Sequence, residues 1–192
     1  SMINAISRRG PDNEDSFFDQ GVFLGHRRLS VIDISDKSHQ PMVDNNLKLA
    51  IVFNGVIYNY KELRNKLKKL GYSFFSDGDT EVILKSYHHY GSDCVKHFDG
   101  VFAFCIYDIK LKKFFLSRDR LGIKPLYYKS TNNNFSFSSN TKALINNGKH
   151  KIDKTSLHYQ FTLHSVIPSP NTILENIKKL EPGHSMIVDF EG

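Results

Sequence analysis

The fold of this chain is organised around one ten-residue stretch, Ile51-Val52-Phe53-Asn54-Gly55-Val56-Ile57-Tyr58-Asn59-Tyr60. The apolar run before Asn54 predicts a buried strand. Asn-Gly is a common turn dipeptide, so the simplest interpretation is a tight turn that ends the strand. The same pair can also place a carboxamide N–H beside an unobstructed backbone N–H, and two such donors suit a developing oxyanion. Taken alone, the dipeptide favours the turn and leaves the oxyanion site open.

The bulk composition is that of a soluble globular protein. A length of 192 residues predicts one domain with a single core, and 40% of the residues are hydrophobic and 24% charged. No apolar run approaches the roughly 20 residues that span a bilayer, and residues 1–30 lack the apolar core of a signal peptide. We therefore expect a cytoplasmic protein with no membrane partner.

The net charge of +6 raises the question of nucleic-acid binding. The lysines are scattered over an expected helix, an expected hairpin tip and the last part of the chain, as on solvated faces. We expect no nucleic-acid partner. Cys94 and Cys105 suit buried thiols, and the histidines show no ligand spacing, so we expect no metal site.

Hydrophobic periodicity predicts an α+β domain with antiparallel sheets. Helices are expected over 59–70, from a cap at Asp79 to Gly91, over 93–98 and 141–146, and from a cap at Asp153 to about Leu163. Residues 2–9 suggest the tail of a helix, and 35–46 a loop. Strands are expected at 17–24, 28–34, 47–53, 101–107, 113–117, 126–129, 135–139 and 184–189, and those between 101 and 139 should form an antiparallel meander.

A series of short motifs adds specificity that no single motif has. In chain order they are Arg9-Gly10-Pro11-Asp12, His26-Arg27-Arg28-Leu29-Ser30-Val31-Ile32-Asp33, Gln40-Pro41-Met42, Phe53-Asn54-Gly55-Val56-Ile57-Tyr58-Asn59, Asp79-Thr80-Glu81-Val82-Ile83-Leu84, Gly100-Val101-Phe102-Ala103-Phe104, Arg118-Asp119-Arg120-Leu121-Gly122-Ile123-Lys124-Pro125-Leu126-Tyr127-Tyr128 and Pro168-Ser169-Pro170-Asn171-Thr172-Ile173. The set resembles the glutamine-hydrolysing, type 2 amidotransferase domain of asparagine synthetases, which are N-terminal-nucleophile hydrolases. The resemblance covers nearly all 192 residues.

The resemblance implies a four-layer α-β-β-α sandwich and a glutaminase reaction. In that family an N-terminal cysteine thiolate attacks the carboxamide carbon of glutamine, ammonia leaves, and water clears the thioester. By resemblance, the Asn54 side chain and the Gly55 backbone N–H form the oxyanion hole. Arg28 would pair with the α-carboxylate of glutamine and Asp79 with its α-ammonium. The backbone of Ile32 would frame the substrate.

Each of these roles has a plainer alternative. Without the family, Arg28 is more simply a surface arginine in a basic run, and Asp79 is equally well a helix N-cap. Val56 stands in the expected substrate site where the family has glutamate, and valine cannot accept hydrogen bonds from an ammonium group. Asn140 replaces another family glutamate. By resemblance, the motif with Arg118, Asp119 and Tyr128 is mainly structural and interfacial.

Three features of the family have no counterpart in the sequence: the N-terminal Cys-Gly-Ile, the first strand with most of the first helix, and the Ser-Gly-Gly-Leu-Asp-Ser motif that holds ATP. We therefore expect residues 1–192 to form an amidotransferase domain that lacks its nucleophile and is inactive alone. Ser1 should not replace the cysteine, because it precedes the helix that follows the family's first strand. A missing strand would leave an edge that a homodimer or a rearranged loop would cover.

The leading hypothesis is a glutaminase domain that supplies ammonia for amidation of aspartate. Its expected partners are glutamine and the C-terminal synthetase domain of a full-length chain. No cofactor is expected in this domain, since ATP and magnesium would bind the synthetase domain. The alternative is a binding or scaffold module that keeps the fold without catalysis, and a basic nucleic-acid-binding domain is a weaker third hypothesis. A gene with Cys-Gly-Ile directly after the start methionine would favour the enzyme.

Overall fold

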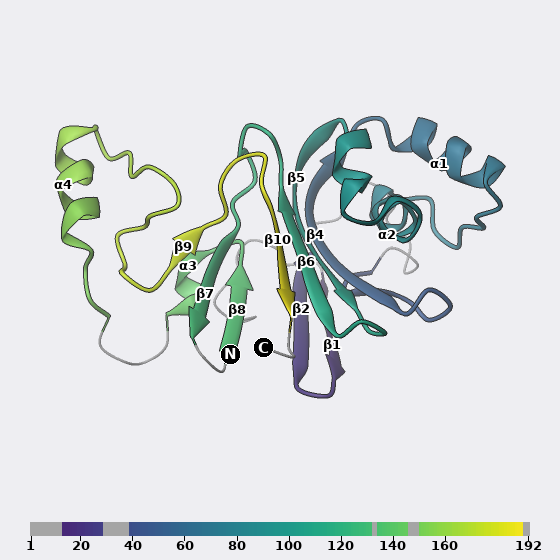
Figure 1. Cartoon of the computed structure of the whole chain (residues 1–192), viewed down its shortest axis with the longest axis horizontal. Helices are drawn as coiled ribbons and strands as arrows, with labels where there is room; N and C mark the ends of the chain where they lie inside the picture. Colours follow the sequence, from purple (N-terminus) through teal and green to yellow (C-terminus); the bar gives the residue numbers. More distant parts are fainter. Residues whose placement is uncertain (1–12, 29–38, 132–133, 146–149, 190–192) are drawn as a thin grey trace.

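Antiparallel strands dominate the computed structural model, which describes residues 13–28, 39–131, 134–145 and 150–189. The expected α+β class with antiparallel sheets is confirmed (Figure 1). At its centre is a five-stranded sheet in the order β10-β6-β5-β4-β3. These strands are β3 (Met42–Asp44), β4 (Leu49–Ile57), β5 (Gly100–Asp108), β6 (Lys113–Arg118) and β10 (Ser185–Asp189).

One face of this sheet is covered by α1 (Tyr60–Lys69) and α2 (Asp79–Tyr90), which Figure 1 shows on the same side of β4 and β5. A 3₁₀ helix, η3 (Gly91–His97), follows α2. The apolar stripes of the two predicted helices are buried against the sheet, as their spacing requires. Alternate residues of the two central strands fill the same core, namely Leu49, Ile51, Phe53, Phe102, Phe104 and Ile106.

The opposite face of the sheet packs on a second layer of strands. This layer contains the hairpin of β1 (Asn13–Asp19) and β2 (Val22–Arg28), and a three-stranded sheet of β8 (Asn134–Ser138), β7 (Tyr127–Thr131) and β9 (Lys178–Lys179). The intervening residues of β4 and β5 form a second core with this layer, namely Ala50, Val52, Ala103, Cys105 and Tyr107. Both central strands are apolar on both faces because each face lies in a core.

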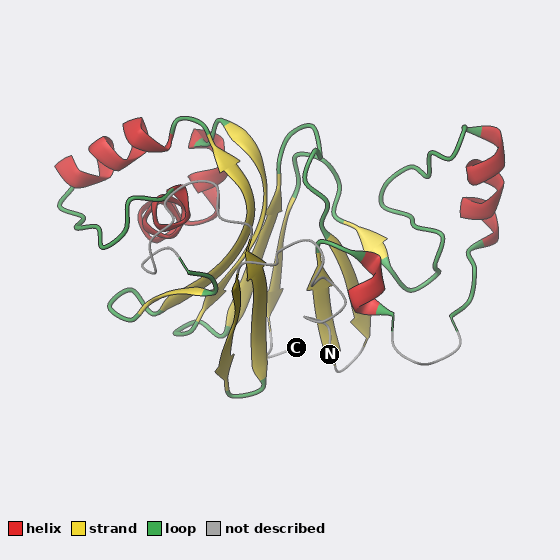
Figure 2. Cartoon of the chain, turned by 180° about the vertical axis from the view of Figure 1, so that it is seen from behind, coloured by secondary structure: helices red, strands yellow, loops and turns green. Residues whose placement is uncertain are grey.

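Two more helices complete the described chain. The short helix α3 (Thr141–Leu144) contacts β7 and β8. Helix α4 (Lys154–Thr162) begins at its predicted cap, where Asp153 Oδ1 accepts a hydrogen bond from the Ser156 N–H at 2.6 Å. It lies at the opposite end of the molecule from α1 and α2 (Figure 2). No helix in the described part of the chain is long and apolar enough to cross a membrane.

Two predictions need correction near the N-terminus, one of a strand and one of a loop. The expected strand at 17–24 contains a turn, because Asp19 pairs with Val22 and the intervening Gln20 and Gly21 have φ angles of 42° and 90°. Positive φ at both central positions is typical of the tightest hairpin turns. The expected strand from Arg28 to Ile34 falls mostly outside the described residues. The expected loop at 35–46 contains the edge strand β3.

The predicted meander is also wrong, since β6 and β7 lie in different sheets. The segment between them is held by Arg118, whose guanidinium donates to the carbonyls of Lys124, Leu180 and Gly122 at 2.6–2.7 Å. The neighbouring carboxylate of Asp119 accepts from four backbone N–H groups, those of Phe102, Leu121, Ile123 and Lys124. These bonds turn the chain from one sheet to the other, so the structural role expected for this motif is confirmed.

Candidate functional site

The candidate site lies on the edge of β4 where the neighbouring strand β3 ends. The last paired residues are Met42 and Ile51, and in the described part of the chain β4 continues to Ile57 with a strand only on its β5 side. Side chains take the place of the missing strand. Gln40 Oε1 accepts from the Phe53 N–H at 2.6 Å, and Asp79 Oδ2 accepts from the Ile57 N–H at 2.9 Å.

The backbone N–H of Gly55 lies between these two amides. Alternate residues of a strand point their N–H groups to the same side, so the amides of Phe53, Gly55 and Ile57 all face away from β5. The contacts of Phe102, the partner of Gly55 in β5, agree with this direction. The N–H of Phe102 donates to the Asp119 carboxylate at 3.3 Å, and the carbonyl of Phe102 accepts from the Asp119 N–H at 2.8 Å. Both groups of Phe102 therefore face away from β4. The Gly55 N–H is therefore directed to the open edge of β4.

The Asn54-Gly55 pair is not a turn, and that part of the prediction is wrong. Both residues continue β4, opposite Ala103 and Phe102. Glycine is required because a Cβ at position 55 would lie 2.2 Å from the Val101 carbonyl oxygen, and its φ of +154° also disfavours other residues. Local turn preference was overridden by pairing with β5, and the glycine allows close approach of two backbones.

Asn54 directly precedes this amide in the strand. Strand alternation places Asn54 and Val56 on the face that carries Ala50 and Val52, toward the layer containing β2. Both residues are partly exposed, whereas the preceding five residues of the strand are buried. The strand thus delivers a carboxamide and a backbone N–H to a partly open surface. This is the donor pair that the oxyanion hypothesis requires.

Asp79 closes the other end of this edge. Gly78 is the N-cap of α2, so the expected cap at Asp79 is misplaced by one residue, and Asp79 is the first helical residue. The segment that leads into α2 is held by the buried Arg64, which donates to the carbonyls of Ser76 and Gly78 at 2.7 and 2.8 Å. Burial raises the pKa of the Asp79 carboxyl, although N–H groups including that of Ile57 oppose the shift.

We predict that Asp79→Asn flattens the pH dependence of stability. Because the pKa of Asp79 is raised in the folded state, this group stabilises the fold below its unfolded pKa, and the contribution is lost as pH rises through the folded pKa. The wild type should lose this contribution across that window and the variant should not. Thermal midpoints from about pH 3 to pH 7 measure the difference. Asp77→Asn, on a fully exposed side chain, is the control, and the same flattening there would contradict the prediction.

The structure does not test the remaining predicted site residues. Arg28 is the last residue of β2, where its backbone pairs with Asn13, but its side chain and all of Ile32 lie outside the described residues. β2 does reach the site, because His26 Nε2 hydrogen-bonds the Phe53 carbonyl oxygen at 3.1 Å. The convergence of Arg28 with Asn54 and Asp79 on one cleft therefore stays a prediction.

Sequence reasoning missed the roles of His26 and Gln40. The histidines are expected to bind no metal, and neither His26 nor Gln40 has a predicted role beyond its motif. Both contact the backbone of Phe53, immediately before Asn54. The contacts join residues 27 and 13 positions apart, so no local pattern shows them. No signal in the sequence points to the Gln40 contact, because residues 35–46 are expected to form a loop and β3 (Met42–Asp44) becomes visible only in the structure.

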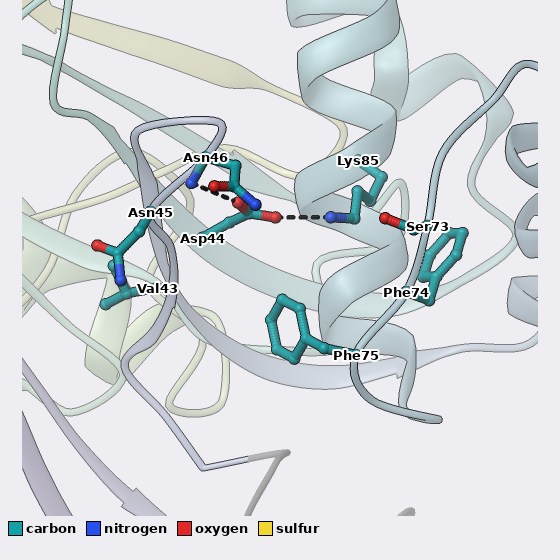
Figure 3. A pocket seen from close by; sticks show the side chains of 8 residues that line it. All are labelled: Val43, Asp44, Asn45, Asn46, Ser73, Phe74, Phe75 and Lys85. Atoms are coloured by element: carbon teal, nitrogen blue, oxygen red, sulfur yellow. Dashed lines mark hydrogen bonds and ion pairs between the residues drawn. The ribbon is translucent and has the colours of Figure 1, made fainter.

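A pocket of about 360 Å³ lies elsewhere, between the β3–β4 turn and α2 (Figure 3). Its polar wall is an ion pair, with Lys85 Nζ 2.6 Å from Asp44 Oδ2 and 3.4 Å from Glu81 Oε1. Burial opposes ionisation of Asp44, but Lys85 and the Leu47 N–H hold its pKa below the usual value. These charged groups pair with one another, which indicates a structural network. No residue expected to bind substrate lines this pocket.

No group of three or more metal-binding side chains is clustered within the described ranges. Cys94 and Cys105 are buried free thiols, as their sequence context suggests. Burial raises the pKa of Cys94 to about 12, so this thiol is not activated as a nucleophile. The described groups at the open edge of β4 that can donate hydrogen bonds are thus the Asn54 side chain and the Gly55 N–H.

Comparison with known proteins gives this geometry a context. The family described as glutamine amidotransferase domain matches residues 1–192. A putative glutamine-hydrolysing asparagine synthetase 2 of Methanocaldococcus jannaschii is 42% identical, covering 99% of this chain and 40% of the relative. Glutamine-hydrolysing asparagine synthetase 1 of Bacillus subtilis is 39% identical, covering 100% of this chain and 30% of the relative. The chain thus spans well under half the length of these relatives.

A solved structure supports the fold. Glutamine phosphoribosylpyrophosphate amidotransferase from B. subtilis, in complex with ADP and GMP, superimposes with a TM-score of 0.59 at 21% identity. The match covers 88% of this chain and 33% of that one, and at this identity it is evidence about the fold alone. The family match and the sequence relatives identify the family as well as the fold. The chain belongs to the glutamine amidotransferase domain family and is homologous to the glutaminase domains of asparagine synthetases.

Proposed function

We propose that this domain, within its full-length protein, hydrolyses glutamine and supplies the ammonia for amidation of aspartate. The observation that carries the proposal is the Gly55 N–H, directed to the open edge of β4 beside the Asn54 side chain. An oxyanion formed from the glutamine carboxamide needs two donors of this kind. Family membership supplies the substrate class, because the relatives are named as glutamine-hydrolysing asparagine synthetases.

The remaining groups would hold the amino-acid end of glutamine. In this proposal Asp79 would receive the α-ammonium and Arg28 the α-carboxylate, and the Ile32 backbone would frame the substrate. Asp79 Oδ2 accepts a hydrogen bond from the Ile57 N–H, which orients the carboxylate. A carboxylate can accept further hydrogen bonds, so this contact does not exhaust its capacity. Val56 adds no charge, so Asp79 would carry most of the ammonium recognition.

The attack on the carboxamide carbon would come from the N-terminal cysteine of the family, in the full-length protein, and not from Cys94 or Cys105. ATP and magnesium would bind the synthetase domain.

The complete fold proposed for the domain is the four-layer α-β-β-α sandwich of N-terminal-nucleophile hydrolases. Three layers support it: the α1–α2 pair, the five-stranded sheet and the second layer of strands. The proposed reaction also sets the partner, which is the ATP-dependent synthetase part of the same polypeptide.

Isotope transfer tests the proposed function. The full-length gene product is incubated with ATP, magnesium, aspartate and glutamine labelled with ¹⁵N at the amide, and the asparagine formed is analysed by mass spectrometry. We expect the label in the asparagine side chain. Unlabelled asparagine, or label retained in glutamine while ammonium salts still support synthesis, would contradict the proposal.

Val56 favours one second candidate, a module that binds glutamine or a related amide without hydrolysing it. This residue lies beside Asn54 on the same partly exposed face of β4, where a valine offers no hydrogen bond to an ammonium group. The two functions differ in one measurement. A module would show saturable glutamine binding by calorimetry with no ammonia release.

A further inference from the structure

We propose that Gln40 and His26 are positioning residues that hold the peptide preceding Asn54 and thereby set the geometry of the oxyanion hole. The two side chains grip both polar groups of Phe53. Gln40 Oε1 accepts from its N–H at 2.6 Å, and His26 Nε2 bonds its carbonyl oxygen at 3.1 Å. The inference rests on the proposed glutaminase function.

The Gln40 side chain accepts a hydrogen bond that a longer β3 would otherwise accept. β3 pairs with β4 only from Asp44 to Met42, opposite Leu49 to Ile51. The next N–H of β4 on that side belongs to Phe53, whose residue is only 4% exposed, so water cannot readily satisfy it. A buried unpaired amide costs about 1–3 kcal/mol. Gln40, two residues before β3, supplies a side-chain acceptor where the backbone has left the sheet.

The His26 contact fixes the orientation of the next residue. The Phe53 carbonyl and the Asn54 N–H belong to one planar peptide unit, so a bond that holds the carbonyl also holds the Asn54 backbone. The Phe53 ring is packed in the core between the sheet and α1–α2, which anchors the other side. A displacement of about 1 Å in a reacting group can cost about 100-fold in rate. The two contacts restrict this displacement.

The opposite end of the segment is held in a comparable way. Asp79 accepts from Ile57, and the Tyr58 N–H donates to the Asp99 carbonyl at 2.7 Å. Asn54 to Val56 is therefore a short, partly exposed segment with both flanks fixed. The Gln40 and His26 contacts act on the flank adjacent to the carboxamide of Asn54, so we assign orientation of this donor to them.

Variants of Gln40 in the full-length gene product test the assignment. Gln40→Leu removes the acceptor, and Gln40→Glu keeps an oxygen acceptor on a side chain of the same length. We expect Gln40→Leu to lower kcat for ammonia release from glutamine by at least about tenfold with KM changed less than about twofold. Gln40→Glu should restore most of kcat. An unchanged kcat in Gln40→Leu would overturn the proposal, as would equal losses in both variants.

The control removes an equivalent bond far from the site. Asp153→Leu deletes a side-chain acceptor that also lies 2.6 Å from a backbone N–H, at the start of α4. Its kcat should stay at the wild-type value, and a loss equal to that of Gln40→Leu would indicate general destabilisation and overturn the proposal. Hydrogen exchange at the Phe53 amide gives a readout that does not need activity. Gln40→Leu should accelerate it and Gln40→Glu should restore it, while an unchanged rate would overturn the proposal.

Failure of the proposed function is distinguishable from failure of this inference. A wild-type full-length product that releases no ammonia from glutamine would contradict the function itself. The amide-exchange experiment would then still decide whether Gln40 holds the Phe53 N–H. An active wild type with a fully active Gln40→Leu variant would leave the function intact and remove the positioning role.

Discussion

Replacing Asp119 with alanine is expected to lower the free energy of unfolding by about 3–5 kcal/mol, since each buried amide left unpaired costs about 1–3 kcal/mol. Asp119 is 1% exposed, and its carboxylate accepts from four backbone N–H groups. Those of Phe102 and Lys124 belong to partly or fully buried residues, so water cannot fully replace the carboxylate. Urea unfolding followed by circular dichroism measures the change.

The pH dependence provides an internal check on this prediction. Burial tends to raise the pKa of Asp119, but the N–H bonds from Lys124, Ile123 and Phe102 outweigh it and hold the pKa below the usual value. The group therefore adds stability above its unfolded pKa, and this stability is lost as pH falls through the folded pKa. Asp119→Ala should remove this acid sensitivity. Asp108→Ala, which also removes an acceptor from one backbone N–H but at an exposed hairpin, is the control and should cost far less.

Replacing Asn54 with alanine should lower kcat for glutamine hydrolysis by the full-length gene product about 100–1,000-fold, the usual cost of losing one oxyanion donor. KM for glutamine should change little, because the donor acts on charge that develops after binding. In the described part of the chain the Asn54 carboxamide makes no hydrogen bond within the protein, so the variant should fold normally. Steady-state ammonia release measures both constants.

The matched control is Asn45→Ala, on the turn between β3 and β4 and in the wall of the separate pocket. The same deletion there should leave kcat unchanged. A kcat for Asn54→Ala within threefold of wild type would contradict the oxyanion role, and so would an equal loss in the control.

Long apolar segments were predicted well because both of their faces are buried. Every residue of β4 from Leu49 to Phe53 lies in one of the two cores, so the run that predicted a strand is a direct consequence of the layers. The stripes of α1 and α2 were equally clear, since each helix has one face against the sheet. The N-cap at Asp153 was predicted because a side-chain cap acts within three residues.

Features that depend on distant backbone were not predictable in this way. Asn54-Gly55 has the composition of a turn, yet pairing with β5 makes it part of a strand, and the glycine is needed because Val101 lies too close for a Cβ. The chain passes to another sheet between β6 and β7. This change depends on the Asp119 carboxylate, which accepts from the N–H groups of Phe102 in β5 and of Lys124 in the connecting segment. In the site, Asn54 and Gly55 came from a resemblance between motifs, while the contacts of His26 and Gln40 became visible only in the folded chain.

The most direct test of the account is ammonia release from glutamine by the full-length gene product, without ATP or aspartate. We expect glutamine-dependent ammonia, with glutamate formed in equal amount, because the proposed site at Asn54 and Gly55 stabilises the oxyanion of carboxamide hydrolysis. A folded product that makes asparagine from ammonium salts but releases no ammonia from glutamine would contradict the central claim.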